Sequence, residues 1–221
     1  MLKIDIHKTF SLKNEPFQLQ LKAEFKEGEI TALYGPSGVG KTTILRLIAG
    51  LENPDKGVIA YNDQLWFNDR MIVPLKDRPV GIVFQEFNLF RNMTVLQNLG
   101  FASDQNTIST EIKTMCDQLG ITDLFSRKPH QLSKGQQQKI AIVRTLCQKN
   151  EILLLDEPFS ALDDKSIKDI IQVIDQYRVD QKMTVILVSH RKDVILKMAQ
   201  SFISMETGEQ GEPAKMISVD F

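Results

Sequence analysis

The sequence contains no long hydrophobic segment. Apolar runs such as Ile152–Leu155 and Val185–Val188 have the length of strands, far below the roughly 20 residues that a helix needs to cross a bilayer. Residues 1–5 carry charge within their apolar stretch, so we expect no signal peptide. If the protein serves a membrane, these absences predict that it acts from the surface, through a partner.

The sequence also contains few cysteines and has almost no net charge. Cys116 and Cys147 are the only two cysteines among 221 residues, far apart in the sequence and without metal-ligand spacing. They exclude a disulfide framework and are typical of small buried side chains in a reducing compartment. Lysine and arginine number 27 and aspartate and glutamate 28, which gives a formal net charge of -1. Because there is no basic excess, we do not expect nucleic acid as a partner.

What the sequence does contain is an alternation of short strands and helices, without internal repeats or low-complexity tracts. In the second half, buried strands alternate with amphipathic helices, which predicts an α/β fold with a mainly parallel sheet. We expect a single domain over residues 1–221. Within it, residues 1–85 and 151–221 would form this core together with an N-terminal antiparallel β subdomain, and residues 86–150 an inserted helical subdomain.

A glycine-rich loop follows the predicted strand Ile30–Tyr34 and opens a predicted helix over 42–49. It reads Gly35, Pro36, Ser37, Gly38, Val39, Gly40, Lys41 and Thr42, the pattern of a phosphate-binding P-loop. Glycines let consecutive N–H groups turn toward phosphate oxygens, and the helix adds its positive N-terminal end. We expect Lys41 to reach the β- and γ-phosphates, the Thr42 hydroxyl to ligate Mg²⁺, and Thr43 to lie at the nucleotide. A chance match is the alternative, but the strand and the helix supply the context that this chemistry requires.

Polar residues follow two further predicted strands, at the sheet edge where α/β folds bind ligands. Asp156 and Glu157 end an apolar run, where Asp156 would hold Mg²⁺ and Glu157 would polarise the attacking water. Strands often end in acids, but the P-loop upstream favours the functional interpretation. His190 emerges at the same edge and could hydrogen-bond the γ-phosphate and that water. The alternative, a surface or satisfied core histidine, is kept for His7 and His130.

The stretch around Ser133 has two compatible interpretations. Ser133 and Gln136 have the spacing of a capping box, which predicts a well-formed helix N-terminus. With Gly135 nearby, such an N-terminus is also an anion-binding site. The residues alone do not choose between a helix cap and a phosphate ligand.

Taken in order, these motifs resemble the nucleotide-binding domain of ABC ATPases, a P-loop NTPase fold, over essentially the whole chain. Gly35–Thr42 would be Walker A, Gln85 the Q-loop glutamine and Leu132–Gln136 the signature. Ile152–Glu157 would be Walker B with its catalytic glutamate, Ser160–Asp163 the D-loop and His190 the switch histidine. The shared order of these motifs is far more specific than any one of them.

The resemblance implies a mechanism shared between two copies. A second copy, or a paralogous ATPase, would close head to tail around two MgATP, each held between Walker A of one copy and the signature of the other. Ser133, Gly135 and Gln136 would therefore bind ATP in trans. Asp163 would couple the two sites, and Gln85 would bind the metal and link it to the helical subdomain.

Some positions fit the family pattern less closely. Phe10 is the candidate for the aromatic residue that stacks on adenine, although the turn after it is long, and Phe17 is a rival. Lys134 replaces the first glycine of the usual Leu-Ser-Gly-Gly-Gln signature. Arg91 and Lys139 stand where proline and arginine are common in related importers.

The resemblance also implies partners and a location. The segment 73–90 is most similar to molybdate-type anion importers, which predicts an integral membrane permease docked on the helical subdomain and import of a small solute such as an oxyanion. An extracytoplasmic solute-binding protein would complete the system, and the ATPase would lie peripherally at the cytoplasmic face of the cell membrane. Such importers commonly carry a C-terminal ligand-sensing domain, which we do not expect within these 221 residues.

Other functions are alternatives at this point. Lys134 motivates a nucleotide-gated binding module with little hydrolysis, although Lys41, Asp156, Glu157 and His190 all match an active enzyme. A non-transport ABC ATPase, as in DNA repair or translation, would need long insertions or a second domain that this compact chain lacks. A monomeric P-loop kinase would leave the signature and the D-loop unexplained.

Overall fold

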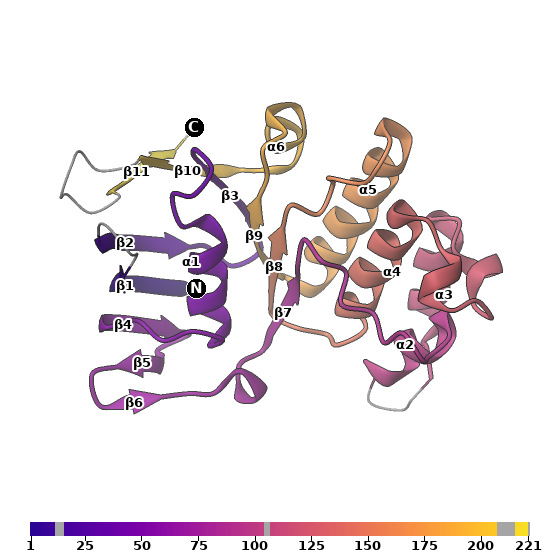
Figure 1. Ribbon diagram of the computed structural model, residues 1–221, viewed down its shortest axis with the longest axis horizontal. Coiled ribbons are helices and arrows are strands. Elements are labelled where there is room, and N and C mark those ends of the chain that lie inside the picture. Colours follow the sequence, from indigo (N-terminus) through magenta and orange to yellow (C-terminus); the bar gives the residue numbers. More distant parts are fainter. Residues whose placement is uncertain (12–15, 104–106, 207–214, 221) are drawn as a thin grey trace.

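The computed structural model describes residues 1–11, 16–103, 107–206 and 215–220. Its strands form two sheets (Figure 1). The first is antiparallel and contains β1 (Leu2–Ser11), β2 (Pro16–Phe25), β4 (Lys56–Tyr61), β5 (Gln64–Asn68) and β6 (Met71–Ile72). These strands lie in the order β2-β1-β4-β5-β6.

The second sheet is mainly parallel. It contains β3 (Ile30–Tyr34), β7 (Val80–Val83), β8 (Ile152–Asp156), β9 (Thr184–Val188), β10 (Ser201–Glu206) and β11 (Lys215–Asp220). The order is β11-β10-β3-β9-β8-β7, in which only β11 pairs antiparallel among the described strands. The α/β fold with a mainly parallel sheet and an antiparallel N-terminal sheet is therefore confirmed.

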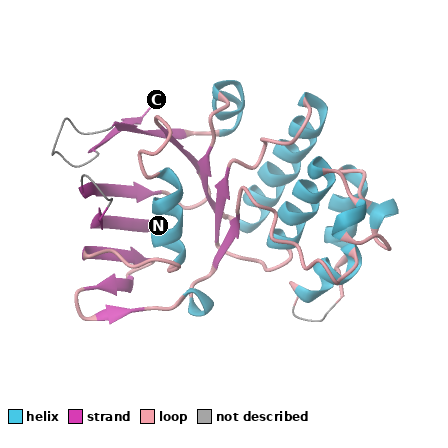
Figure 2. Cartoon of the chain, in the orientation of Figure 1, coloured by secondary structure: helices cyan, strands magenta, loops and turns pink. Residues whose placement is uncertain are grey.

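In chain order, the described helices are α1 (Lys41–Ala49), α2 (Val95–Phe101), α3 (Thr110–Gln118), α4 (Lys134–Leu146), α5 (Asp164–Gln181) and α6 (Lys192–Met198), with short 3-10 helices at Leu75–Asp77, Thr122–Leu124 and Pro129–Gln131. Residues 86–150 thus contain α2, α3 and α4, which gather at one end of the molecule in Figure 2. The division into subdomains stays a prediction.

Helix α1 lies between the two sheets (Figure 1). Its residues Ile44, Leu45, Leu47 and Ile48 are all buried, in one cluster with the inward side chains of the antiparallel sheet and with Leu154 of β8. Most of the helix is thus removed from water, and only Arg46 is exposed. This position fixes the N-terminus of α1 at the edge of the parallel sheet.

The other face of the parallel sheet is covered by α4 and α5. Leu153 and Leu155 of β8 face this layer, whereas Ile152 and Leu154 face α1, as the two-residue period of a strand requires. The apolar run of β8 is therefore continuous because both faces of the strand are buried. Cys116 and Cys147 are both free and buried in this helical layer, as predicted.

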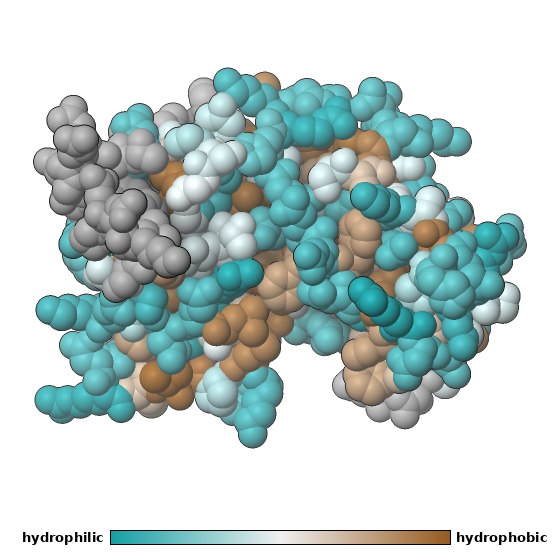
Figure 3. Space-filling model, viewed as in Figure 1, coloured by the Kyte–Doolittle hydropathy of each residue, from teal (hydrophilic) through white to brown (hydrophobic). Residues whose placement is uncertain are grey.

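The surface is largely hydrophilic on the face shown in Figure 3, where hydrophobic side chains gather over β5 and β6. Leu65, Met71 and Ile72 are exposed there. In the part of the chain that the structure describes, no helix is both long enough and apolar enough to span a membrane.

Candidate active site

A cavity of about 420 Å³ lies at the carboxyl ends of β3, β7, β8 and β9. It is lined by the loop and first turn of α1 (Ser37, Gly38, Gly40, Lys41, Thr42, Thr43), by Gln85 after β7, by Asp156 and Glu157 at the end of β8, and by Val188 and His190 at the end of β9. Parallel strands place their carboxyl ends at one edge, so residues far apart in the sequence meet here. Gly35, Pro36 and Val39 belong to the same loop but do not line the cavity.

The loop before α1 is shaped by its glycines. Gly38 and Gly40 have φ angles of 80° and 99°, in the left-handed region that residues with a Cβ rarely adopt. Gly35 permits a close approach, because a Cβ there would lie 2.6 Å from the carbonyl oxygen of Met205 in β10. No side chain caps α1 at Gly40, so the first N–H groups of the helix are left for an anion at its positive end.

Lys41 reaches back over this loop. Its Nζ donates hydrogen bonds to the carbonyl oxygens of Gly35, at 2.7 Å, and Pro36, at 2.8 Å. Burial lowers the pKa of Lys41, and the charges of Glu157 and Asp156 oppose that shift. The ammonium is therefore placed to exchange its carbonyl contacts for phosphate oxygens.

The carboxylate of Asp156 faces the first turn of α1. The Thr42 hydroxyl donates to Asp156 Oδ1 and Oδ2 at 3.1 and 3.0 Å. Burial raises the pKa of Asp156, while the hydrogen bond from Thr42 and the charge of Arg46 act in the opposite direction. The hydroxyl, the carboxylate and the amide of Gln85, which lines the same cavity, offer the oxygen donors that Mg²⁺ prefers. These residues fit the predicted metal.

Glu157 combines an unusual backbone with a carboxylate of which one oxygen makes no hydrogen bond to the described groups. Its φ of 50° lies in the left-handed region, which costs a non-glycine residue about 1–2 kcal/mol. Its N–H donates to the Val188 carbonyl at 2.9 Å, and the His190 N–H donates to its Oε2 at 3.3 Å. The His190 Nε2 lies 3.4 Å from Oε1, but this buried oxygen makes no hydrogen bond with any described group. Burial also raises the pKa of Glu157, so the carboxylate is suited to take a proton from a water molecule.

The predicted signature and D-loop residues lie outside this cavity. The Ser133 Oγ accepts from the Gln136 N–H at 3.2 Å, and the Gln136 Oε1 accepts from the Ser133 N–H at 2.9 Å, so the predicted capping box begins α4. Asp163 caps α5 by accepting from the Ser166 N–H at 2.7 Å. Neither these residues nor Gly135 line the cavity formed by their own chain.

Phe10, the predicted adenine-stacking residue, lies near the end of β1 and packs against the core around α1. The Lys8 Nζ lies 5.8 Å from the centroid of its ring. Phe10 does not line the cavity, and its role at adenine stays a prediction. Phe17 pairs with Phe10 across β1 and β2, but its side chain lies outside the described part of the chain.

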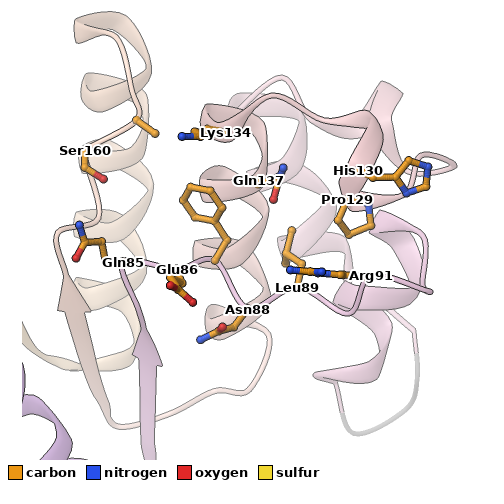
Figure 4. A pocket seen from close by; sticks show the side chains of 12 residues that line it. Gln85, Glu86, Asn88, Leu89, Arg91, Pro129, His130, Lys134, Gln137 and Ser160 are labelled. Atoms are coloured by element: carbon orange, nitrogen blue, oxygen red, sulfur yellow. The ribbon is translucent and has the colours of Figure 1, made fainter.

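A larger groove of about 1160 Å³ adjoins the cavity, and Gln85 lines both. Figure 4 shows Gln85 and Glu86 below the groove, with Lys134 and Gln137 projecting from α4. The exposed side chain of Lys134 points toward the loop that carries Ser160. The groove therefore lies between the Q-loop, the start of α4 and the D-loop.

One buried polar residue beside the site was not predicted. Gln138 of α4 is fully buried and bonds the backbone of Glu157 and of Ala161. A signal for it exists in the sequence, because Gln138 shares the helical spacing of Ala141, Ile142 and Thr145, all of which are buried. A glutamine on the core face of a helix must have hydrogen-bond partners.

Comparisons with known proteins agree with this geometry. The family model described as "ABC transporter" matches residues 19–160. A molybdenum import ATP-binding protein of Methylococcus capsulatus is 38% identical over 208 residues, covering 92% of this chain and 58% of the relative. A sulfate/thiosulfate import ATP-binding protein of Ralstonia nicotianae is 39% identical over 194 residues, covering 84% of this chain and 51% of the relative. The chain thus spans between half and three fifths of the length of these two relatives.

A solved ATP-binding cassette, described as a dimer in a post-hydrolysis state with ADP and Pi, superimposes with a TM-score of 0.81 at 28% identity. The match covers 99% of this chain and 98% of the solved one. The motifs, the fold and the relatives therefore agree, and the chain belongs to the ABC transporter family of ATP-binding proteins.

Proposed function

We propose that this chain is the ATP-hydrolysing subunit of an ABC importer and works as one half of a dimer. The observation that carries the proposal is Oε1 of Glu157, a buried carboxylate oxygen without a hydrogen bond to any described group, on a residue that lines the same cavity as the phosphate loop. A buried carboxylate oxygen without a hydrogen bond is costly unless another group uses it. A water molecule at the γ-phosphate of ATP would be that group.

The chemistry follows from this placement. Lys41 and the N–H groups at the start of α1 would bind the phosphates, and bound Mg²⁺, held by Thr42, Asp156 and Gln85, would neutralise part of their charge. Glu157 would accept a proton as the water oxygen bonds to the γ-phosphorus. The bond from that phosphorus to the β–γ bridging oxygen breaks, which leaves ADP and phosphate. His190 would donate a hydrogen bond to the γ-phosphate and thereby orient it.

The dimer follows from the position of the signature. Ser133 and Gly135 do not line the cavity of their own chain, yet the capped start of α4 offers N–H groups at a positive helix end. A second copy, or a paralogous ATPase, would present this helix to the nucleotide and complete the site. Asp163 would then link the two sites. A solved cassette of the same fold is described as a dimer with ADP and Pi.

The groove beside Gln85 supports the proposed permease partner. It joins the cavity to residues 86–150, which we propose form the helical subdomain of a single 1–221 domain. A permease segment seated there would sense the nucleotide through Gln85. The cassette would lie at the cytoplasmic face of the membrane, with a solute-binding protein on the opposite side. The relatives are named for molybdenum and for sulfate or thiosulfate import, so we propose a small oxyanion as the solute.

The test is the rate of ATP hydrolysis per molecule, measured as a function of protein concentration with excess Mg²⁺. We expect this rate to rise with concentration, because each site is completed by a second copy. Glu157→Gln should abolish hydrolysis while ATP shifts that variant from monomer to dimer in light scattering. Tight ATP binding without hydrolysis at any concentration would instead favour the nucleotide-gated binding module. Hydrolysis at an unchanged rate by a protein that stays monomeric would refute the composite site.

A further inference from the structure

The buried side chain of Gln138 joins two segments of the proposed site. Its Nε2 donates to the carbonyl oxygen of Glu157 at 3.3 Å, and its Oε1 accepts from the N–H of Ala161, also at 3.3 Å. The side chain is fully buried. Glu157 is the proposed general base and Ala161 belongs to the D-loop, so a single amide on α4 holds the backbone of both.

The orientation of this amide follows from its partners. A backbone N–H can only donate and a backbone carbonyl can only accept, so the oxygen must face Ala161 and the nitrogen must face Glu157. Glutamine and asparagine are the side chains that offer a neutral donor and an acceptor on one terminal group. Glutamate in its ionised form would keep the bond from Ala161 and lose the one to Glu157.

The backbone at Glu157 needs such support. Its left-handed φ of 50° is a conformation that a non-glycine residue keeps only where its surroundings hold it. The N–H of Glu157 donates to Val188 of β9, and its carbonyl accepts from the Gln138 side chain and from the Ser160 N–H, each at 3.3 Å. The peptide groups on both sides of the residue are therefore held, and they direct the carboxylate into the cavity.

The same helix touches the D-loop at a second point. A Cβ on Gly135 would lie 3.0 Å from the Ala161 carbonyl oxygen, so the first turn of α4 packs directly on that peptide. Gly135 and Gln138 are three residues apart and lie on one face of the helix. Gly135 belongs to the signature, which would meet the nucleotide of the other copy. One helical face thus connects the signature to the D-loop and to Glu157 within a single chain.

We propose that Gln138 is a positioning residue for ATP hydrolysis. It ties the signature helix of each copy to the general base of that same copy, so a copy whose signature engages ATP also has its own base held in place. The inference rests on the proposed function. It assigns Gln138 to the orientation of Glu157 and not to the binding of ATP, because Gln138 does not line the nucleotide cavity.

The experiment compares Gln138→Met, which keeps the length and removes both hydrogen bonds, with Gln138→Glu, which keeps only the bond from Ala161. We expect kcat to fall roughly 10- to 100-fold in both variants, because a small misplacement of a reacting group has effects of this size. The dissociation constant for ATP should stay within about twofold of the wild type. In the Glu157→Gln background, Gln138→Met should still form the ATP-dependent dimer.

The matched control is Tyr177→Phe. The Tyr177 hydroxyl is buried and donates to the Leu146 carbonyl at the other end of α4, at 3.0 Å, far from the cavity. Its loss should lower the melting temperature about as much as Gln138→Met does, with kcat unchanged.

A kcat within twofold of the wild type in Gln138→Met would overturn the proposal. Rescue by Gln138→Glu would also overturn it, because the effect would then belong to the D-loop alone. A parallel loss of ATP binding and kcat would overturn it as well, because it would show a merely structural role. If the wild type itself does not hydrolyse ATP, the proposed function fails instead.

Discussion

Replacement of Arg78 should be among the most destabilising single changes in this chain. Arg78 is 5% exposed, and its guanidinium donates to the carbonyl oxygens of Val73 at 2.9 Å, Leu47 at 3.0 Å and Ile48 at 2.6 Å. It also lies 5.3 Å from the ring of Trp66. In the described part of the chain no carboxylate pairs with it within 4.0 Å, so its charge is satisfied by carbonyl dipoles.

Two of these carbonyls, those of Leu47 and Ile48, belong to the last turn of α1, the helix whose other end forms the phosphate loop. A cation at the C-terminus of a helix is favourable because it opposes the negative end of the macrodipole. Arg78→Met would remove all of these hydrogen bonds and a further one, at 3.5 Å, to the Trp66 carbonyl. The Leu47 and Trp66 carbonyls keep the backbone N–H groups of Gly50 and Val73 as donors, so the Ile48 and Val73 carbonyls would lose the most, at about 1–3 kcal/mol each. Part of this loss is offset because a charge is no longer buried, so we expect a net loss of about 3–4 kcal/mol.

Urea unfolding followed by circular dichroism measures this effect. With a slope of about 2–3 kcal/mol per molar urea, the midpoint should fall by ~1–2 M. Arg78→Lys keeps the charge but not the planar fork, so its midpoint should lie between those of the wild type and Arg78→Met. The matched control is Arg46→Met on the same helix, which removes an exposed pair with Glu52 and should cost at most about 1 kcal/mol. If Arg78→Met and Arg46→Met unfold at the same midpoint, the reasoning is wrong.

Three further predictions concern titration and metal binding. Burial raises the pKa of Glu157 in the folded state, so its ionisation destabilises the fold as pH rises through that pKa. At pH 7, Glu157→Gln should therefore melt at a higher temperature than the wild type. The difference between the two melting temperatures should shrink at pH below the usual range of a carboxyl group. Thr42→Val removes the hydroxyl that bonds Asp156 and would ligate Mg²⁺, so half-maximal hydrolysis should need roughly 10-fold more Mg²⁺ in a metal titration. Burial raises the pKa of both Cys116 and Cys147 to about 12, so a thiol reagent at pH 8 should label neither in the native protein and both in urea; rapid native labelling would contradict their burial.

Local signals account for the parts of the fold that were predictable from sequence. The helix expected over 42–49 runs from Lys41 to Ala49, because its start follows a glycine loop and Gly50 ends it in the left-handed region with φ 77°. The buried strands β8 and β9 were predictable because both faces of a central parallel strand are apolar. Each of these signals lies within a few residues of the element that it predicts.

The order of the strands has no such local signal. β3 lies between β10 and β9, so neighbours in this sheet come from distant parts of the chain. Their pairing depends on how α1, α4 and α5 cover the two faces, which is a property of the whole core. The left-handed backbone of Glu157 was equally unpredictable, because turn chemistry normally places glycine or asparagine at such a φ. The hydrogen bonds that hold its two peptide groups come from Val188, Gln138 and Ser160, and two of these three residues are distant from Glu157 in the sequence.

The structure also bears on the lysine in the signature. Another backbone approaches closely at Gly135, where a Cβ would lie 3.0 Å from the Ala161 carbonyl oxygen, so a side chain there would crowd the D-loop. Lys134, one residue earlier, is exposed and extends into the groove without crowding its own chain (Figure 4). Lys134 thus replaces the family's first signature glycine at a position where this fold has room for a side chain. The second signature glycine, Gly135, is kept at a position where a side chain would be crowded. Lys134 therefore gives little support to a binding module without hydrolysis, because the contacts of α4 with the D-loop and Glu157 do not involve its side chain.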